Sequence, residues 1–203
     1  MLGRANLPAR HRERTGDRSG PWLDSFGDCT RLLGTGALIA LIGNRGTGKT
    51  QLGCDLIRWV CEREAEKPNP PSMRIDGQTP KPPEGGWRRR EVALYSKALS
   101  LFIDLRSCYR DGGPGEESVV SGFCKIPLLV IDEIHERGNT DWEDRMLVHI
   151  VDRRYDTMLD TVLIGNVAPD QLQKQLGASI VSRIQECGRV VVCDWPSFRA
   201  PPG

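Results

Sequence analysis

The chain has 203 residues, of which 38% are hydrophobic and 27% are charged, and its formal net charge is +1. These values fit one globular domain of ordinary size with flexible ends, and a near-neutral charge does not mark the chain as a nucleic-acid binder. No apolar run approaches the roughly 20 residues that span a bilayer, and the N-terminus lacks the apolar core of a secretion signal, so we expect a cytoplasmic protein with no membrane partner.

The 7 cysteines are scattered and form no C-x-x-C pair, and with only 3 histidines a zinc cluster is not expected. Cys54, Cys124 and Cys193 lie in apolar stretches. We therefore predict that they are small core residues of a protein in a reducing compartment.

Residues 1–35 are predicted to form a flexible basic tail, and residues 36–203 to form the folded domain. Five arginines lie among Gly, Pro and Asp within residues 4–18. Such a segment is typical of a solvated chain end, although it could also contact a partner or a phosphate backbone.

A phosphate-binding loop follows the tail. Residues 43–50 read GNRGTGKT, the complete pattern G-x-x-x-x-G-K-[ST]. The apolar run at 37–42 predicts a buried strand before it, and the apolar spacing at 49–64 predicts a helix after it. This context is what the motif requires, and it argues against a chance glycine-rich turn. The predicted nucleotide-binding residues here are Gly43, Asn44, Arg45, Gly46, Thr47, Gly48, Lys49, Thr50 and Gln51.

Each part of this loop has a chemical role toward a nucleoside triphosphate. The glycines let several N–H groups point at phosphate oxygens, and the helix N-terminus adds the positive end of its dipole. Lys49 is expected to reach the β- and γ-phosphates, and the Thr50 hydroxyl to bind Mg²⁺.

Residues 67–86 are rich in Pro and Gly, so we predict a long surface loop over 67–90. The end of this loop, Trp87 followed by three arginines, is open to two interpretations. One is a solvated loop base with Trp87 packed on the sheet edge, and the other is an aromatic clamp for single-stranded nucleic acid.

A pair of carboxylates follows the next predicted elements. These elements are a strand at 91–96, helices at 97–109 and 115–123, and a strand at 126–132. Asp132 and Glu133 emerge at the carboxyl end of the last strand, where open α/β sheets bind ligands. We expect Asp132 to hold Mg²⁺ through water and Glu133 to polarise the attacking water. The alternative is a strand that simply ends in a charged turn.

The remaining elements complete an α/β fold with a parallel sheet covered by helices on both faces. They are a helix at 141–158 with Met158 on its core face, a strand at 161–165, helices at 169–176 and 178–186, and a strand at 189–193. Asn166 at a strand end could reach the γ-phosphate, and Arg183 on the last helix suits the charge that develops in phosphoryl transfer. Asp152, Arg153 and Arg154 could support the site or a subunit contact, but the pattern favours surface salt bridges.

Five stretches together resemble AAA+ ATPases, and more narrowly the DnaC/IstB-like family, closest to DnaC-type replicative helicase loaders. Residues 42–50 and 128–134 are shared by many ATPases, whereas residues 150–154, 176–184 and 195–199 are much more specific. The resemblance implies a P-loop core with a five-stranded parallel sheet. Because the chain ends about ten residues after its last predicted strand, no sizeable C-terminal lid is expected.

The resemblance also implies ATP and Mg²⁺ as cofactors and a role for each site residue. The loop at 43–50 would be Walker A, and Asp132 with Glu133 would be Walker B. Asn166 would be sensor 1. Arg183 would be the arginine finger offered to the ATP of a neighbouring subunit, so the resemblance implies a homo-oligomer with ATP at subunit interfaces.

The partners implied are a replicative hexameric helicase and single-stranded DNA. Family members use ATP-dependent assembly to open or hold the helicase ring. The helices at 97–109 and 115–123 match a helical wedge that meets single-stranded DNA, with Lys97, Arg106 and Arg110 as its phosphate contacts.

The chain departs from the family pattern in several places. Loaders usually carry a separate N-terminal domain that grips the helicase, whereas only about 35 residues precede the first strand here. A second arginine often lies four residues before the finger, and that position is Ser179. The usual sensor 2 helix is not evident, and Arg199 is the candidate substitute. The 67–86 insertion has no counterpart in the pattern.

Three functions remain open. The first is a AAA+ helicase loader that binds ATP, Mg²⁺ and single-stranded DNA and hydrolyses ATP slowly under partner stimulation. The second is an IstB-type transposition helper, which shares this core but directs a transposase. The third is a nucleotide-binding scaffold with little hydrolysis. A viral packaging motor would share the Walker pair, but it should be larger and carry a nuclease domain.

Overall fold

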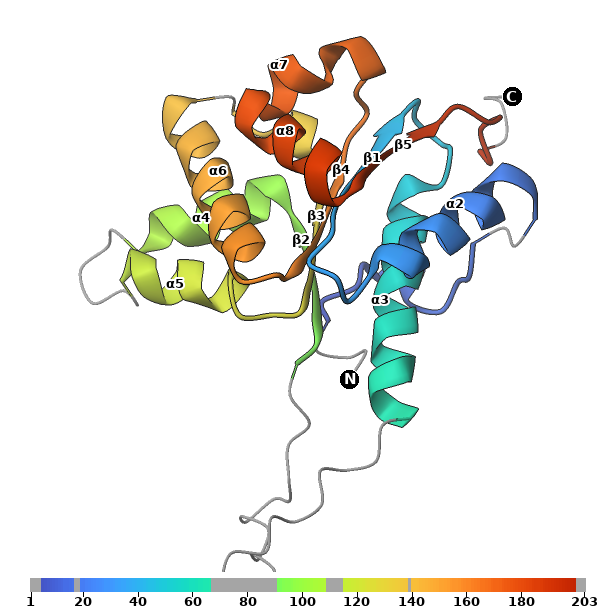
Figure 1. Cartoon of the computed structure of the whole chain (residues 1–203), viewed down its shortest axis with the longest axis horizontal. Coiled ribbons are helices and arrows are strands. Elements are labelled where there is room, and N and C mark those ends of the chain that lie inside the picture. The colour runs from blue at the N-terminus through green and yellow to red at the C-terminus, as the bar shows by residue number, and fades with distance from the viewer. Residues whose placement is uncertain (1–4, 17–18, 67–90, 109–114, 139, 200–203) are drawn as a thin grey trace, which may run out of the picture.

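The computed structural model describes residues 5–16, 19–66, 91–108, 115–138 and 140–199. Within these ranges, one sheet has the strand order β2-β3-β4-β1-β5 (Figure 1). Its strands are β1 (Leu38–Gly43), β2 (Ala93–Lys97), β3 (Leu128–Asp132), β4 (Asp160–Ile164) and β5 (Arg189–Cys193). All neighbouring strands pair in parallel, so the predicted five-stranded parallel sheet is confirmed.

The central strands are apolar because neither of their faces meets solvent. Strands β3 and β4 are buried along their whole length. Continuous apolar runs of this kind are typical of parallel sheets with helices on both sides. The register pairs Leu41 of β1 with Ile164 of β4, and Leu163 with Ile131 of β3. The carboxyl ends of these three strands therefore lie next to one another at one edge.

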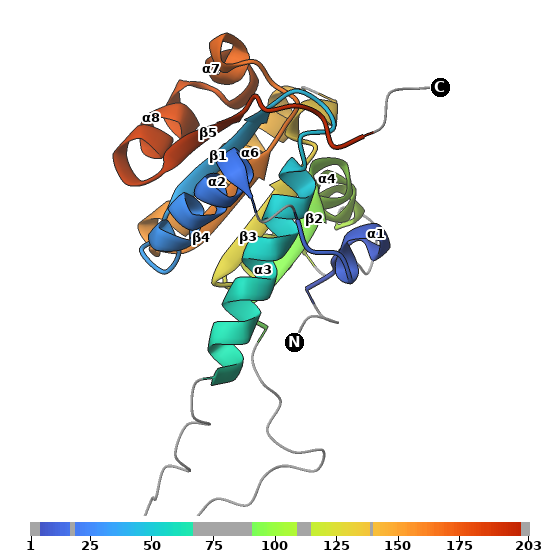
Figure 2. The ribbon, with the colours of Figure 1, turned by 90° about the vertical axis from the view of Figure 1, so that its right-hand side faces the viewer.

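Helices cover both faces of the sheet (Figures 1 and 2). One face carries α1 (Ala9–Arg12), α2 (Gly20–Leu32) and α3 (Lys49–Glu66). The other carries α4 (Ala98–Ser107), α5 (Glu116–Phe123), α6 (Asp141–Asp156), α7 (Leu172–Leu176) and α8 (Ala178–Cys187). Two short 3-10 turns, η2 (Ile134–Glu136) and η3 (Pro169–Gln171), connect strands to helices.

Residues 5–16 and 19–35 differ from the predicted flexible tail, because they form two helices and contribute buried side chains to the α3 face of the sheet. Trp22 and Cys29 of α2 are buried, as are Ala5 and Leu7. The carbonyl of Ala5 accepts a hydrogen bond of 2.8 Å from Tyr95 N, so the start of the described chain lies along β2. Isolated apolar residues among arginines gave no periodic signal, and composition alone therefore suggested a tail.

Arg154 also differs from its prediction. It was expected in a surface salt bridge, but it is fully buried at 0% exposure. Its guanidinium donates to Thr161 Oγ1 at 2.8 Å and to the carbonyl of Ile126 at 2.9 Å, and further bonds reach the carbonyls of Phe123, Pro127 and Asp160. These acceptors lie around the amino ends of β3 and β4. Burial lowers the pKa of Arg154 to about 10, so it remains charged at neutral pH.

The other two members of that helical triplet follow the prediction. Arg153 pairs with Glu117 at 2.8 Å, and Asp152 pairs with Arg183 at 3.1 Å. Met158, predicted on the core face of the same helix, instead lies beyond its end with a φ of 55° and is 68% exposed. The helix stops at Asp156 because the chain turns there to enter β4.

Cys54, Cys124 and Cys193 are buried, which confirms them as core residues. No helix in the described ranges is both long and apolar enough to cross a bilayer. The predicted loop at 67–90, with Trp87, lies outside the described residues, and so does Arg110.

Candidate nucleotide-binding site

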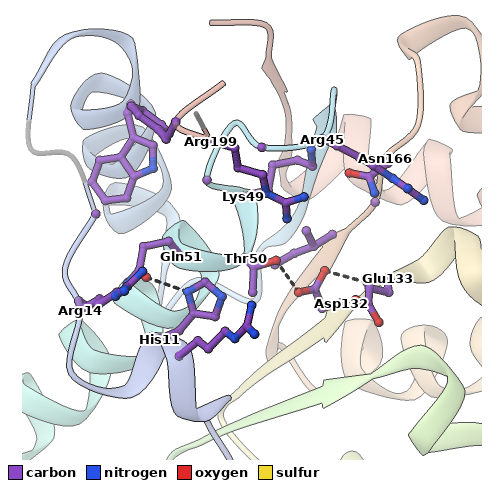
Figure 3. A pocket seen from close by; sticks show the side chains of 18 of the residues that line it. His11, Arg14, Arg45, Lys49, Thr50, Gln51, Asp132, Glu133, Asn166 and Arg199 are labelled. Atoms are coloured by element: carbon purple, nitrogen blue, oxygen red, sulfur yellow. Dashed lines mark hydrogen bonds between the residues drawn. The ribbon is translucent and has the colours of Figure 1, made fainter. Parts of the chain in front are cut away.

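A cavity of 680 Å³ lies at the carboxyl edge of the sheet, at the ends of β1, β3 and β4 (Figure 3). This volume is within the range of small-molecule sites, roughly 300–1,000 Å³. The predicted residues that line it are Arg45, Gly46, Gly48, Lys49, Thr50, Gln51, Asp132, Glu133 and Asn166. Arg199, the candidate substitute for sensor 2, also lines it. The rest of the wall consists of residues that the sequence did not assign to the site, namely Arg10, His11, Arg14, Thr15, Gly16, Trp22, His135, Glu136, Ile164, Gly165 and Phe198.

The phosphate-binding loop folds around the Lys49 side chain. Lys49 Nζ donates to the carbonyl of Gly43 at 2.8 Å and also to the carbonyl of Asn44. Burial lowers the pKa of Lys49 from its usual value, and the negative charge of Asp132 opposes this shift. A desolvated ammonium at the start of α3, where the helix dipole is positive, suits a bound polyanion.

Gly43, Asn44 and Thr47, also predicted to bind nucleotide, belong to the loop but do not line the cavity. Gly43 has a φ of 121°, and a Cβ there would lie 2.5 Å from the carbonyl oxygen of Cys193. Thr47 Oγ1 donates to the carbonyl of Asn44 at 3.0 Å. These residues therefore fix the conformation of the loop without facing the cavity.

Asp132 and Thr50 place two oxygen atoms that could bind a metal ion side by side. Thr50 Oγ1 donates to Asp132 Oδ2 at 2.7 Å, and the backbone N–H of Glu133 donates to Asp132 Oδ1 at 2.7 Å (Figure 3). A hydroxyl and a carboxylate fit Mg²⁺, which uses one or two protein oxygens and takes its other ligands from phosphates and water. Within the described ranges there is no cluster of three or more His, Cys, Asp or Glu side chains, as an all-protein metal cage would need.

Tyr95 is a site residue that the sequence analysis missed. Its hydroxyl donates to Asp132 Oδ2 at 2.8 Å from the neighbouring strand β2. Burial, and then the charge of Asp132, raises the pKa of Tyr95, so the hydroxyl stays protonated and remains a donor. The strand at 91–96 was predicted, but its pattern did not reveal which side chains face Asp132.

Glu133 adopts a left-handed backbone conformation, with φ 58° and ψ 40°. Its carboxylate accepts from Lys97 Nζ at 2.8 and 3.0 Å. This hydrogen bond is the main cause that raises the pKa of Lys97. Lys97, expected to contact DNA phosphate, is thus bonded to the residue expected to polarise water.

Asn166, at the end of β4, lies against His135. Its backbone N–H donates to His135 Nδ1 at 3.2 Å, and its side-chain amide nitrogen lies 3.1 Å from His135 Nε2. His135 is three residues after Asp132 and had no signal of its own in the sequence. The two residues close the side of the cavity next to β3.

No protein-family model matches the chain. The replicative helicase loader DnaC of Escherichia coli (strain K12) is 28% identical over 113 residues, which cover 55% of this chain and 46% of DnaC. The uncharacterized protein YdaV of the same strain is 34% identical over 110 residues, which cover 54% of this chain and 44% of YdaV.

Two solved structures have the same fold. A crystal structure of the DnaC helicase loader superposes with a TM-score of 0.67 at 17% identity, over 91% of this chain and 99% of the loader chain. The replication initiator DnaA bound to AMPPCP and single-stranded DNA superposes with a TM-score of 0.64 at 16% identity, over 92% of this chain and 50% of DnaA.

The chain is therefore similar in sequence to DnaC and YdaV over about half its length, and it shares its fold with the DnaC and DnaA structures. The resemblance to DnaC-like AAA+ proteins inferred from its motifs is thereby confirmed. The chain spans about half the length of the curated relatives it matches. What those whole proteins do therefore enters only as a proposal below.

Arg183 lies outside the cavity of this DnaC-like chain. On α8, its guanidinium pairs with Asp152 at 3.1 Å and lies 5.2 Å from the ring centre of Tyr155. Arg106 is likewise paired, with Glu143 at 3.0 Å. Neither guanidinium is directed at the nucleotide cavity of its own chain.

The N-terminal segment is held to α3 by a polar network next to the cavity. The His11 ring nitrogen Nδ1 lies 2.7 Å from Gln51 Oε1, and Gln51 Nε2 donates to the carbonyl of Arg14 at 2.8 Å. Asp55 accepts from Gly16 N at 2.7 Å and from Gln51 Nε2 at 3.0 Å. Gln51 thus acts mainly by fixing residues 11–16 as one wall of the site.

The C-terminal segment crosses the phosphate-binding loop from the opposite side. Trp195 Nε1 donates to the carbonyl of Thr47 at 2.8 Å, and Phe198 N donates to the carbonyl of Gly46 at 2.9 Å. Gly46 has a φ of 86°, a conformation that favours glycine, and a Cβ there would lie 2.0 Å from Ser197 Oγ and 3.1 Å from Ser197 Cβ. The crossing brings Arg199, the candidate substitute for sensor 2, to the cavity wall.

Proposed function

We propose that this chain is an ATP-dependent helicase loader, which binds ATP with Mg²⁺ and single-stranded DNA and assembles a replicative hexameric helicase onto DNA. One observation carries the proposal. The phosphate-binding loop, the Asp132–Glu133 pair and Asn166 line a single cavity in a chain similar to DnaC over 113 residues. In this proposal the bound ion is Mg²⁺, held by Thr50 and Asp132, and it neutralises phosphate charge.

The residues then divide the work of ATP hydrolysis. Lys49 contacts the phosphates, Asn166 orients the attacking water or the γ-phosphate, and Glu133 polarises the water. Glu133 is paired with Lys97 in this structure, at 2.8 Å. Its carboxylate must leave that pair to act as a base, so we expect slow hydrolysis that a partner stimulates.

Arg183 is proposed to complete the site of a neighbouring subunit. Arg183 does not line the nucleotide cavity of its own chain. A guanidinium that stabilises the charge of phosphoryl transfer must reach the phosphates, so it would have to reach those of another subunit. This requires a homo-oligomer with ATP at subunit interfaces. Arg183→Ala should keep ATP binding and lose hydrolysis. Mixing it with Lys49→Ala subunits, which retain the finger, should restore part of the activity, whereas normal hydrolysis by Arg183→Ala alone would exclude this role.

The DNA-binding surface is proposed to lie on α4. Leu99 and Ile103, four residues apart on this helix, are 51% and 56% exposed. Lys97 and Arg106 flank them, each paired with a carboxylate that a DNA phosphate could displace. The superposed DnaA structure, which holds single-stranded DNA, supports a nucleic-acid role for this type of fold.

The deciding experiment combines hydrolysis with capture of the partner. The parent chain and Glu133→Gln are assayed with and without single-stranded DNA, and a pull-down in ATP and Mg²⁺ is read by mass spectrometry. If the chain is a loader, the parent hydrolyses ATP and captures a hexameric helicase. The hydrolysis rate of Glu133→Gln should then be lower by about 100-fold or more. Capture of a transposase would instead identify a transposition helper. Absence of turnover under both conditions would identify a scaffold.

A further inference from the structure

Two tryptophans approach the phosphate-binding loop from opposite ends of the chain, and only one of them uses its indole N–H there. Trp195 Nε1 donates to the carbonyl of Thr47 at 2.8 Å. Trp22 is 3% exposed, yet its N–H makes no hydrogen bond to any acceptor in the described part of the chain. A buried indole usually finds an acceptor for its N–H. The Trp22 N–H is therefore available to a ligand.

The Trp22 donor lies at the nucleotide cavity, next to Gly48. Trp22, Gly48 and Phe198 all line the cavity. A Cβ on Gly48 would be 3.3 Å from Trp22 Nε1 and 3.3 Å from the Phe198 ring. A hydrogen-bond donor and two aromatic rings thus meet beside the same glycine of the loop.

The Trp22 ring is fixed in this position by its neighbours. It stacks on Phe26 with ring centres 5.8 Å apart and an interplanar angle of 5°. Gly16 packs against the six-membered ring of the Trp22 indole, since a Cβ on Gly16 would lie 2.1 Å from Trp22 Cζ2. Gly16 is in turn held by Asp55 at 2.7 Å. The donor is therefore preorganised, which favours ligand binding because little freedom remains to be lost.

We propose that Trp22 and Phe198 form the subsite for the base of the bound nucleotide. In this subsite, the Trp22 N–H donates to an acceptor on the edge of the base, and the Phe198 ring covers one of the base faces. This inference rests on the proposed nucleotide-binding function and deepens it.

The chemistry of the two sides of the loop favours a base over a phosphate at this position. A phosphate would bind Lys49 and the N–H groups at the start of α3, which are charged or strongly polar donors. Trp22 and Phe198 instead offer two apolar rings and one neutral donor, the Trp22 N–H. Such a surface suits a flat heteroaromatic ligand. Phe198 is 51% exposed, so its outer face is available for contact.

The test compares ATP with inorganic tripolyphosphate, which carries the phosphates without a base. Affinities for both are measured by calorimetry on the full chain with Mg²⁺. The variants are Trp22→Phe, which keeps a ring and removes the N–H, and Phe198→Ala, which changes a half-exposed side chain. Trp59→Phe is the matched control, because Trp59 lies on α3 outside this cavity, beneath the guanidinium of Arg63 at 4.6 Å.

We expect Trp22→Phe to weaken ATP binding about fivefold and Phe198→Ala about tenfold, with tripolyphosphate binding and the Trp59→Phe control unchanged. Thermal unfolding checks that each variant folds. If both folded variants bind ATP like the parent, or lose ATP and tripolyphosphate equally, the base subsite is wrong while the nucleotide site stands. If the parent chain binds neither ligand, the proposed function itself fails, and this inference fails with it.

Discussion

The two sides of the nucleotide cavity are built in different ways. The phosphate side consists of strand ends and the start of α3, which are embedded in buried apolar residues of the sheet such as Ile42 and Ile131. The opposite side consists of residues near the two chain ends. These segments are held to the loop and to α3 by a small set of hydrogen bonds, such as those from Phe198 to Gly46 and from Gly16 to Asp55, and by a few buried side chains such as Trp22.

This difference implies a division of roles. Apolar packing makes the phosphate side resistant to local opening, whereas segments near a chain terminus that a few partly buried hydrogen bonds hold in place open at lower free energy. We therefore expect the sheet to set the chemistry and the terminal segments to set access and selectivity. Substitutions on each side should separate these effects.

Arg154→Leu should have the largest effect and act on the sheet side alone. It leaves the carbonyls around the amino ends of β3 and β4 without their donor, for example that of Ile126. Loss of a buried charged donor costs about 3–5 kcal/mol of unfolding free energy. Urea denaturation of the parent and the variant measures this loss of unfolding free energy. Arg153→Leu, at the neighbouring half-exposed residue, is the control and should leave the midpoint almost unchanged. Equal losses in both variants would mean that the buried network is not the cause.

Lys49→Ala should remove nucleotide binding without unfolding the chain. The ammonium now donates to two loop carbonyls and, in the proposed complex, to phosphate oxygens. We expect the affinity for ATP with Mg²⁺ to fall by about 100-fold or more, as measured by calorimetry. Lys174→Ala, on the exposed side of α7, should bind like the parent. Retention of ATP affinity in Lys49→Ala would mean that the phosphate side has been assigned incorrectly.

Asp55→Ala tests the side built from the chain ends. It removes the acceptor of Gly16 N and of Gln51 Nε2, so residues 11–16 lose much of their attachment to α3. We expect a loss of about 2 kcal/mol in unfolding free energy and faster amide exchange confined to the N-terminal segment. Glu62→Ala on the same helix is the control. Exchange that accelerates equally in the sheet would contradict the proposed independence of the two sides.

The same division explains what could be predicted from the sequence. The sheet, the phosphate-binding loop and the acidic pair were predicted because each is a local pattern, an apolar run or a fixed spacing within a few residues. Asp132 and Asn166 then reach one cavity because parallel strands end at a common edge. No contact between distant residues had to be known.

The contacts of the chain ends could not be predicted in this way. Trp195 meets Thr47 across 148 positions of sequence, and no periodicity records that contact. Tyr95 and Arg154 were missed for a related reason. Both lie in elements that were predicted, but their partners, Asp132 and the carbonyls near β3, come from other elements. Which side chain faces which neighbour is decided by tertiary packing.

Thiol labelling gives the smallest and most local test of the comparison. Burial raises the pKa of Cys29 on α2 to about 12, and burial also raises the pKa of Cys124 next to α5, so neither forms much thiolate at pH 8. In the folded parent, a maleimide should modify the half-buried Cys108 and Cys187 first. In Asp55→Ala, we expect Cys29 to react about twofold to fivefold faster while Cys124 keeps its rate, as mass spectrometry of the peptides would measure. If both thiols accelerate together, the chain ends and the sheet open as one unit, and the two sides of the cavity are not independent.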